Sequence, residues 1–242
     1  MAKPNSIELP TGEKFPILYE DRAVMAIDKP RGWMLVPFSW QSTSRNLQAA
    51  LTSSVAAGDF WARSRGLKYL RFVHRLDAET TGILLLAKSQ GAVSTFGTLF
   101  ESRKMEKVYL TVVQGAPREP EWTCELKLAP DANQRGAVTV DARHGKDAET
   151  HFRVLQKGDR TSLVEARPFT GRTHQIRVHL AESGHPVVGD DLYGAASRND
   201  RTNLGLRAAE LAYHDPFSGR RVEIRAPMQQ FVREYGFELP KR

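Results

Sequence analysis

Short apolar runs, bounded by glycine, proline and acidic residues, make up most of the hydrophobic pattern, which is typical of β-strands. The run at 83–87 is continuously apolar and predicts a fully buried strand. Further strands are predicted at 17–19, 23–27, 107–113, 123–128, 137–140, 150–155, 162–166, 209–214 and 220–226. The last two flank a five-residue turn and predict a hairpin.

Three segments carry apolar residues at spacings of three and four, which predicts helices. The first helix is expected to begin at Ser44 as its N-cap, the second covers 93–100, and the third covers 171–184. On the third helix, Arg177 shares a face with Ile176 and Leu180, so a cation is expected on the apolar side.

Strands outnumber helices and do not alternate with them regularly, which favours an α+β fold. We expect a mixed, mostly antiparallel central sheet flanked by helices and loops. Residues 1–14 contain prolines and a glycine without any period, so a loose N-terminal leader is expected there. The stretch 58–68 predicts a loop. No long linker interrupts 15–242, which predicts a single domain over that range.

The composition is that of an ordinary globular protein, with 40% hydrophobic and 26% charged residues. No apolar window approaches the roughly 18 residues that span a bilayer, and the N-terminus lacks the apolar core of a secretion signal. We therefore expect a cytoplasmic protein that does not enter membranes. The single cysteine, Cys124, excludes an internal disulfide and is expected to be a small apolar filler.

A formal net charge of +7 and a pI near 9.6 make nucleic acid the favoured class of partner. Simple solubility is the alternative explanation for this charge. The chain contains no glycine-rich nucleotide-binding loop, no Gly-x-Ser-x-Gly elbow and no His-Glu-x-x-His motif. His174 and His179 are five residues apart, which places them on different helix faces, so no metal site is expected.

Three polar residues at buried-looking positions are the candidates for chemistry. Asp77 comes just before the buried strand at 83–87, where a carboxylate is costly unless it is paired. Arg177 would keep such a carboxylate ionised and oriented, and Asp77 could then act as a nucleophile or a base. Tyr109 lies opposite its strand neighbours, so its ring is placed to stack on a nucleic-acid base.

Each candidate also has a purely structural interpretation. Asp77 could form a turn by bonding its own backbone. The pair of Asp77 and Arg177 could be a buried ion pair that only stabilises the fold. Tyr109 could be an ordinary core tyrosine. The residues alone leave these alternatives open.

Several ordered motifs resemble those of the RluA-type pseudouridine synthases. They are His-Arg-Leu-Asp-x-x-Thr-Thr-Gly at 74–82, Lys-x-Tyr at 107–109, Gly-Arg-Thr-His-Gln-Ile-Arg-Val-His at 171–179 and Gly-His-Pro-x-x-Gly-Asp at 184–190. Tyr-Glu-Asp at 19–21 and Lys-Pro-x-Gly at 29–32 also resemble that family's opening strands. The resemblance covers about residues 17–227.

The resemblance implies the pseudouridine synthase fold, with an active-site cleft across the sheet. It implies an isomerase that breaks the uracil–ribose bond in RNA, turns the base and rejoins it through a ring carbon, without a metal or organic cofactor. The family's essential aspartate falls on Asp77, its active-site tyrosine on Tyr109 and the arginine that pairs with the aspartate on Arg177. Whether Asp77 attacks the ribose or the base, or removes a ribose proton, stays open.

Recognition of RNA is assigned to residues near these three. Arg75 is expected to contact the site that opens when uridine leaves the stack. The RNA-binding candidates are His74, Arg75, Arg172, His174 and Gln175. We expect structured ribosomal or transfer RNA as the partner of a monomer with no obligate protein partner.

Two departures from the family qualify the resemblance. Thr81 stands where the family usually has serine, which keeps the hydroxyl. The first matching strand begins at residue 17, so no small RNA-binding domain is expected before the catalytic domain. Recognition would then fall to the catalytic face or to inserts at 40–70 and 197–207.

Two other functions remain as alternatives. A catalytically silent RNA-binding module is disfavoured because Asp77, Tyr109 and Arg177 are all present. A metal-dependent RNA hydrolase is disfavoured because the sequence shows no ligand cluster.

Overall fold

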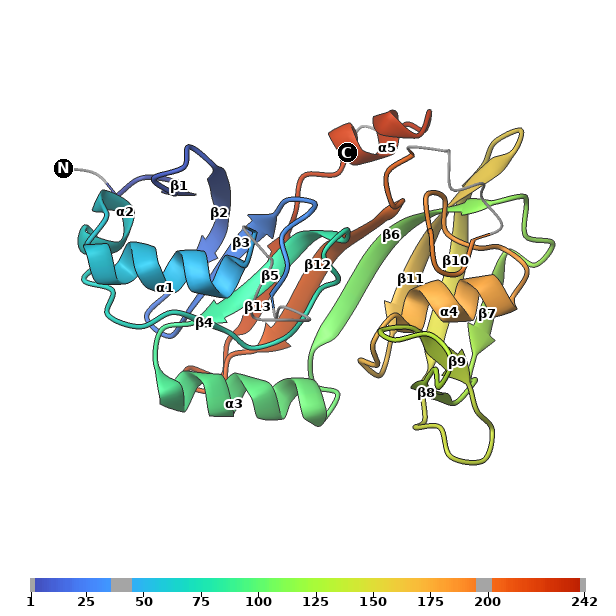
Figure 1. Ribbon diagram of the computed structural model, residues 1–242, viewed down its shortest axis with the longest axis horizontal. Coiled ribbons are helices and arrows are strands. Elements are labelled where there is room, and N and C mark those ends of the chain that lie inside the picture. The colour runs from blue at the N-terminus through green and yellow to red at the C-terminus, as the bar shows by residue number, and fades with distance from the viewer. Residues whose placement is uncertain (1–2, 36–44, 195–201, 240–242) are drawn as a thin grey trace. The chain divides into compact units, whose positions relative to one another are not determined.

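The computed structural model describes residues 3–35, 45–194 and 202–239 (Figure 1). The chain forms two compact units. The first comprises Met1–Met105 with Leu211–Ala226, and the second comprises Glu106–Glu210 with Pro227–Arg242. The strand pairings within each unit are mainly antiparallel, which confirms the predicted α+β class. The expectation of a single domain over 15–242 stays a prediction.

The first unit is a sheet with the strand order β1-β2-β3-β5-β12, with β4 beside β5 and β13 beside β12. Its strands are β1 Ser6–Glu8, β2 Lys14–Glu20, β3 Val24–Lys29, β4 Arg71–Phe72, β5 Thr81–Ala87, β13 Arg221–Arg225 and, from residue 211 on, β12 Leu206–His214. The apolar β3 and β5 pair along their length, from Val24 opposite Ala87 to Lys29 opposite Gly82. The predicted burial of 83–87 is confirmed.

The described residues of the first unit include the helices α1 Leu47–Ala57, α2 Phe60–Arg63 and α3 Gln90–Glu101. The N-cap of α1 is Asn46, whose side chain accepts a hydrogen bond from the Ala49 N–H. The predicted cap Ser44 lies outside the described residues. The loop predicted at 58–68 is wrong in part, because α2 lies there with Trp61 buried. A single helical turn is too short to show a period.

The second unit has the strand order β12-β6-β11-β10-β7, with β8 and β9 forming a separate pair. Its strands are β6 Glu106–Gln114, β7 Glu121–Cys124, β8 Leu128–Pro130, β9 Val138–Val140, β10 Thr150–Lys157, β11 Thr161–Pro168 and the part of β12 up to residue 210. Its helices are α4 Gln175–Glu182 and α5 Gln229–Glu234. Cys124 is buried, as expected of an apolar filler.

Helix α4 is shorter than the predicted range 171–184. His174 precedes it with φ of 52°, a left-handed conformation that no α-helix contains, so the helix begins at Gln175. The predicted burial of Arg177 on this helix is confirmed.

The loose leader expected over 1–14 is a further correction. Ser6–Glu8 forms β1, and Ile7 pairs with Phe15 of β2. Both of these side chains are fully buried. Three strand residues are too few to show an alternation in the sequence. None of the helices described in the structure is long and apolar enough to cross a membrane.

Candidate active site

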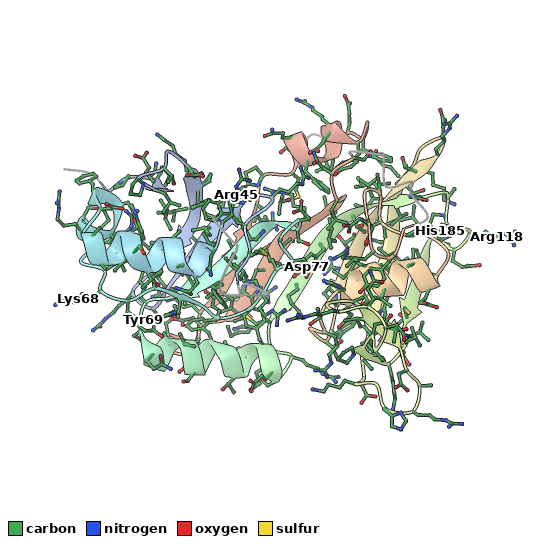
Figure 2. All side chains as sticks on the ribbon, viewed as in Figure 1. Arg45, Lys68, Tyr69, Asp77, Arg118 and His185 are labelled. Atoms are coloured by element: carbon green, nitrogen blue, oxygen red, sulfur yellow. The ribbon has the colours of Figure 1, made fainter. Side chains whose placement is uncertain are left out.

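Asp77, labelled in Figure 2, lies in the loop between β4 and β5 of the first unit. Its side chain is partly exposed, and its carbonyl accepts a hydrogen bond from the Thr80 N–H at 3.2 Å. The loop therefore turns tightly before it enters the buried strand β5. A carboxylate at this position is held on a fixed backbone and is still accessible to a ligand.

Lys29 at the end of β3 holds this loop in place. Its ammonium group is fully buried and donates to the carbonyls of Ala78 and Thr80, both at 2.8 Å, and of Pro30 at 3.1 Å. The Gly32 N–H adds a bond of 2.9 Å to the Ala78 carbonyl. The Lys-Pro-x-Gly motif thus binds the backbone on the C-terminal side of Asp77.

The charge of Lys29 is balanced by the same loop. Burial lowers the pKa of the Lys29 ammonium to about 8, and the negative charges of Glu79 and Asp77 oppose that shift. The sequence pattern marked Lys29 only as a strand end and part of a motif. Its burial could have been suspected, because it continues the apolar strand β3.

His74 has a structural function, and the RNA contact predicted for it stays a prediction. Its Nε2 accepts a hydrogen bond from the Leu85 N–H at 3.0 Å, and its ring stacks on Phe100 with centroids 4.6 Å apart. Because Nε2 accepts, this nitrogen carries no proton. His74 therefore fixes the start of the loop against β5. Arg75, the next residue, is exposed and stays a candidate for RNA contact.

Tyr109 lies on β6 in the second unit, opposite Ala166 of β11. It is partly buried and packs against the core cluster that contains Ala166 and Ile176. Lys107, two residues earlier, is on the same face of the strand, and its Nζ donates to the Thr170 carbonyl at 2.7 Å. Burial lowers the pKa of Lys107 to about 8. A single chain of contacts thus joins the Tyr109 strand to the loop before α4.

Arg177 makes a bidentate ion pair with Asp190 inside the second unit. Nε donates to Oδ2 at 2.8 Å and Nη2 to Oδ1 at 2.7 Å, and the guanidinium carbon lies 5.2 Å from the ring centre of Tyr193. Burial raises the pKa of the Asp190 carboxyl, but Arg177 and the N–H groups of Tyr193 and Leu192 outweigh it and hold that pKa below its ordinary value. The predicted pairing of Arg177 with Asp77 stays a prediction.

Asp190 is a functional neighbour that the sequence analysis missed. It had been noted only as the end of a motif, thirteen positions after Arg177 and beyond the helix. No helical spacing joins the two residues. The signal was the motif itself, since a buried carboxylate needs a cation or several N–H donors close by.

Tyr193 connects Arg177 to His174. The Tyr193 hydroxyl accepts from the Val138 N–H and lies 2.8 Å from His174 Nδ1. The Tyr193 hydroxyl therefore orients the His174 ring, which is partly exposed. Its contact with RNA stays a prediction.

Gln175 is a correction to the predicted RNA contacts. Its side chain is 4% exposed, and its Oε1 accepts from the Thr170 hydroxyl and the Arg172 N–H. Its Nε2 donates to the Glu149 carbonyl and the Thr150 hydroxyl, both at 2.9 Å. All hydrogen-bonding groups of the amide are used, so none is left for RNA. Burial cannot be read from a polar residue at the start of a helix.

The predicted site residues therefore fall into two groups. His74, Arg75 and Asp77 belong to the first unit, and Tyr109, Arg172, His174, Gln175 and Arg177 belong to the second. Within the ranges that the structure describes, no group of three or more His, Cys, Asp or Glu residues could hold a metal ion. The active-site cleft expected across the sheet stays a prediction.

Comparisons with known proteins agree with the sequence motifs. The family model described as RNA pseudouridylate synthase matches residues 23–182. A protein of Bacillus subtilis named as the uncharacterized RNA pseudouridine synthase YlyB is 32% identical, over 90% of this chain and 70% of its own length. The dual-specificity RNA pseudouridine synthase RluA of Vibrio cholerae is 35% identical, over 84% of this chain and 78% of its own.

Ribosomal large subunit pseudouridine synthase C of Vibrio vulnificus is 34% identical over 88% of this chain. The chain spans 65% of the length of that relative.

Solved structures are similar as well. Human RNA pseudouridylate synthase domain containing 1 is 29% identical, with a TM-score of 0.70 over 88% of this chain and 83% of its own. Human RNA pseudouridylate synthase domain containing 4 has a TM-score of 0.74 at 21% identity, over 93% of this chain and 94% of its own. The second similarity bears on the fold alone.

Proposed function

Because this chain belongs to the RNA pseudouridylate synthase family, we propose that it converts specific uridines of ribosomal or transfer RNA to pseudouridine with Asp77 as the catalytic carboxylate. It is an RNA pseudouridine synthase of the RluA type, an isomerase. The observation that carries the assignment of Asp77 is its loop, which the buried Lys29 ammonium binds at two carbonyls. A fixed and accessible carboxylate is what such a reaction requires.

The chemistry balances without a co-reactant. The bond between the ribose and a ring nitrogen breaks, the base turns in the site, and a ring carbon forms the new bond to the ribose. That carbon loses a proton and the nitrogen gains one. A stacked uridine cannot be reached, so the nucleotide must first be flipped out of the RNA. Asp77 supplies the negative charge, as a nucleophile or as a base.

Tyr109 and Arg177 support this step in our proposal. Tyr109 stacks on the uracil ring and helps to remove the proton from the ring carbon. Arg177 orients the Asp77 carboxylate. The rigid geometry of Arg177 supports that assignment, because Asp190 and Tyr193 hold the guanidinium in one place.

In this proposal the protein is a cytoplasmic monomer, and it binds RNA through its positive charge. The net charge of +7 favours a polyanion, and the exposed Arg75 and Arg172 are placed near the proposed catalytic groups in their own units. Arg75 fills the gap left by the flipped nucleotide, because it is exposed and directly precedes the Asp77 turn.

The first prediction concerns Asp77→Asn, which removes the charge at nearly constant shape. We expect turnover to fall by about 10²–10⁴-fold, because one acid–base or nucleophilic group is lost. RNA affinity should stay within a few-fold of the wild type. The measurement is pseudouridine formation in transcribed ribosomal and transfer RNA, by nucleoside analysis, in buffer that contains a chelator.

The matched control is Glu101→Gln, which removes an exposed carboxylate of the same unit at the end of α3. It should keep most of the turnover. An Asp77→Asn protein as active as the Glu101→Gln protein contradicts the assignment. Mapping pseudouridines in cells with and without the gene then identifies the uridine.

A further inference from the structure

The loop 169–174 of the second unit, between β11 and α4, displays an aromatic ring to solvent. Phe169 is 49% exposed. Single exposed hydrophobic residues are common on protein surfaces, so exposure alone does not mark a binding site. The backbone that holds the ring and the polar groups beside it are more informative.

The backbone of this loop is braced from three sides. The Phe169 N–H donates to the Glu149 carbonyl at 2.9 Å. The Thr170 carbonyl accepts from Lys107 Nζ, and the Thr170 hydroxyl donates to Gln175 Oε1. The ring is thus attached to a rigid segment, and a ligand that stacks on it would not have to order the loop first.

Arg172, three residues further, is anchored at one end only. Its Nε donates to the Asp147 carbonyl at 3.0 Å. Within the part of the chain that the structure describes, its two Nη groups have no hydrogen-bond partner, and the side chain is exposed. A guanidinium held at Nε and open at both Nη groups is well arranged to bind two oxygens of a phosphate.

The loop also adjoins Tyr109. Lys107, which binds the Thr170 carbonyl, is on the same face of β6 as Tyr109 and two residues from it. The Lys107 ammonium thus links the backbone of this loop to the strand that carries Tyr109.

We propose that Phe169 and Arg172 form a subsite for one unpaired nucleotide of the RNA substrate. The Phe169 ring stacks on its base, and the Arg172 guanidinium binds a phosphate beside it. The proposal rests on the proposed function and extends it to the binding of the RNA substrate. It predicts a preference for single-stranded or looped RNA, because a base inside a duplex cannot stack on a protein ring.

Single-stranded RNA fits this surface better than a protein does. The exposed residues next to Phe169 in the chain are Arg167, Gly171 and Arg172, and of the two cations Arg167 is ion-paired with Glu165 at 2.8 Å. An aromatic ring beside a cation with open N–H groups, as in Arg172, is typical of single-strand binding, where a base stacks and the backbone is neutralised. A stable protein interface needs a broad core that is depleted of charge.

The test measures binding of a fluorescein-labelled oligouridine of about twelve nucleotides and of a duplex RNA of equal length. Phe169→Ala and Phe169→Leu should weaken binding of the single strand by about 5- to 100-fold, and Phe169→Trp should preserve it. Duplex affinity should change little. The matched control is Phe60→Ala, a similarly exposed ring of the first unit at 44%, which should bind as the wild type does.

Two further readouts keep the proposal testable if a variant is poorly folded. Tryptophan fluorescence of Phe169→Trp should be quenched by oligouridine, and that of Phe60→Trp should not. Arg172→Gln should lower the slope of log affinity against log salt by about 0.7, the loss of one phosphate contact on a single strand. Equal affinities of Phe169→Ala and Phe60→Ala for the oligouridine, or no quenching of Phe169→Trp, overturn the subsite.

These binding measurements do not depend on catalysis. If the wild type binds oligouridine through Phe169 but forms no pseudouridine in any RNA, the proposed function fails and the subsite stands. If the wild type is active and Phe169→Ala binds and turns over normally, the function stands and the subsite fails.

Discussion

Lys29 is a fully buried cation whose ammonium group has three carbonyl acceptors, two of them in the loop that carries Asp77. An ammonium group has three N–H donors, so the group is saturated. Removal of one partner of a buried hydrogen bond costs more than the bond contributes, because the acceptor loses both the bond and its water. A single side chain thus determines both the local stability and the position of the proposed catalytic carboxylate.

Lys29→Met should therefore lower both stability and turnover. We expect the free energy of unfolding to fall by about 2–5 kcal/mol, since three carbonyls lose the ammonium donor and only that of Ala78 keeps another, the Gly32 N–H. Turnover should fall in the protein that remains folded. Urea unfolding and single-turnover kinetics measure the two effects. The control is Lys68→Met at an exposed position, labelled in Figure 2, which should change neither quantity. A fully active, stable Lys29→Met protein contradicts this function of Lys29.

The pH dependence of stability, compared between the wild type and Lys29→Met, tests whether the buried ammonium titrates. Burial lowers the pKa of Lys29 in the folded protein to about 8, against 10.5 as its ordinary value. Between these two values the unfolded chain binds more protons than the folded one, so stability rises with pH in that window. Wild-type stability should therefore rise relative to Lys29→Met from about pH 8 to 10.5. A constant difference over that range would exclude titration of Lys29.

At the residue scale the sequence predicts the burial of Arg177 but neither its partner Asp190 nor the burial of Gln175. Helical spacing placed Arg177 on the apolar face, and it is 5% exposed. Its observed partner Asp190 is beyond the helix, where no periodicity applies. Gln175 shows the reverse error, because a polar residue at a helix start suggests a ligand contact, whereas tertiary packing has buried it. Partners and burial of polar groups depend on contacts distant in sequence.

At the element scale, length determined which structures could be predicted. The strands β5 and β6 and the helix α3 are long enough to show their periods, and each was predicted within a few residues. The strand β1 and the helix α2 have three and four residues, and both were missed. The start of α4 was misplaced because the left-handed His174 ends the loop. Histidine adopts that conformation more often than most residues do, but still too rarely for its place in the sequence to indicate it.

The junction of β11 and α4 is built around the Gln175 side chain, which bonds both the 149–150 and the 170–172 backbone segments. Gln175→Leu keeps the volume and removes all four hydrogen bonds. We expect amide hydrogen exchange to rise in 169–174, and oligouridine affinity to fall about as far as in Phe169→Ala, because the ring is no longer held. The junction should open locally, while the amides of β6 and β11 keep their protection from hydrogen exchange.

Gln134→Leu is the control for this element, since Gln134 is an exposed loop residue of the same unit. It should leave exchange in 169–174 unchanged. Unchanged exchange in Gln175→Leu as well would show that Lys107 and the backbone alone hold the loop.

At the scale of the whole molecule, ordered motifs predicted the family and strand patterning predicted the fold class. The matched range of 23–182 contains the Asp77 loop, the Tyr109 strand and Arg177. Motifs of this kind consist of residue types in a fixed order along the chain, and that order can be read directly from the sequence. They cannot show which RNA is bound, because recognition depends on surface charge and on rings such as Phe169 that belong to no motif.

The net charge of +7 should make RNA binding strongly dependent on salt. Each phosphate that the protein neutralises releases counterions, so log affinity falls linearly with log salt. With six or more contacts, affinity should fall by about 10³-fold or more between about 50 and 200 mM salt. The Asp77→Asn protein allows binding to be measured without turnover. Wild-type turnover at saturating RNA should change little with salt, because salt screens the approach of the RNA but not the buried hydrogen bonds of Lys29 or the buried ion pair of Arg177. Affinity that is independent of salt would mean that base contacts alone hold the RNA, and the proposed phosphate contact of Arg172 would then be wrong.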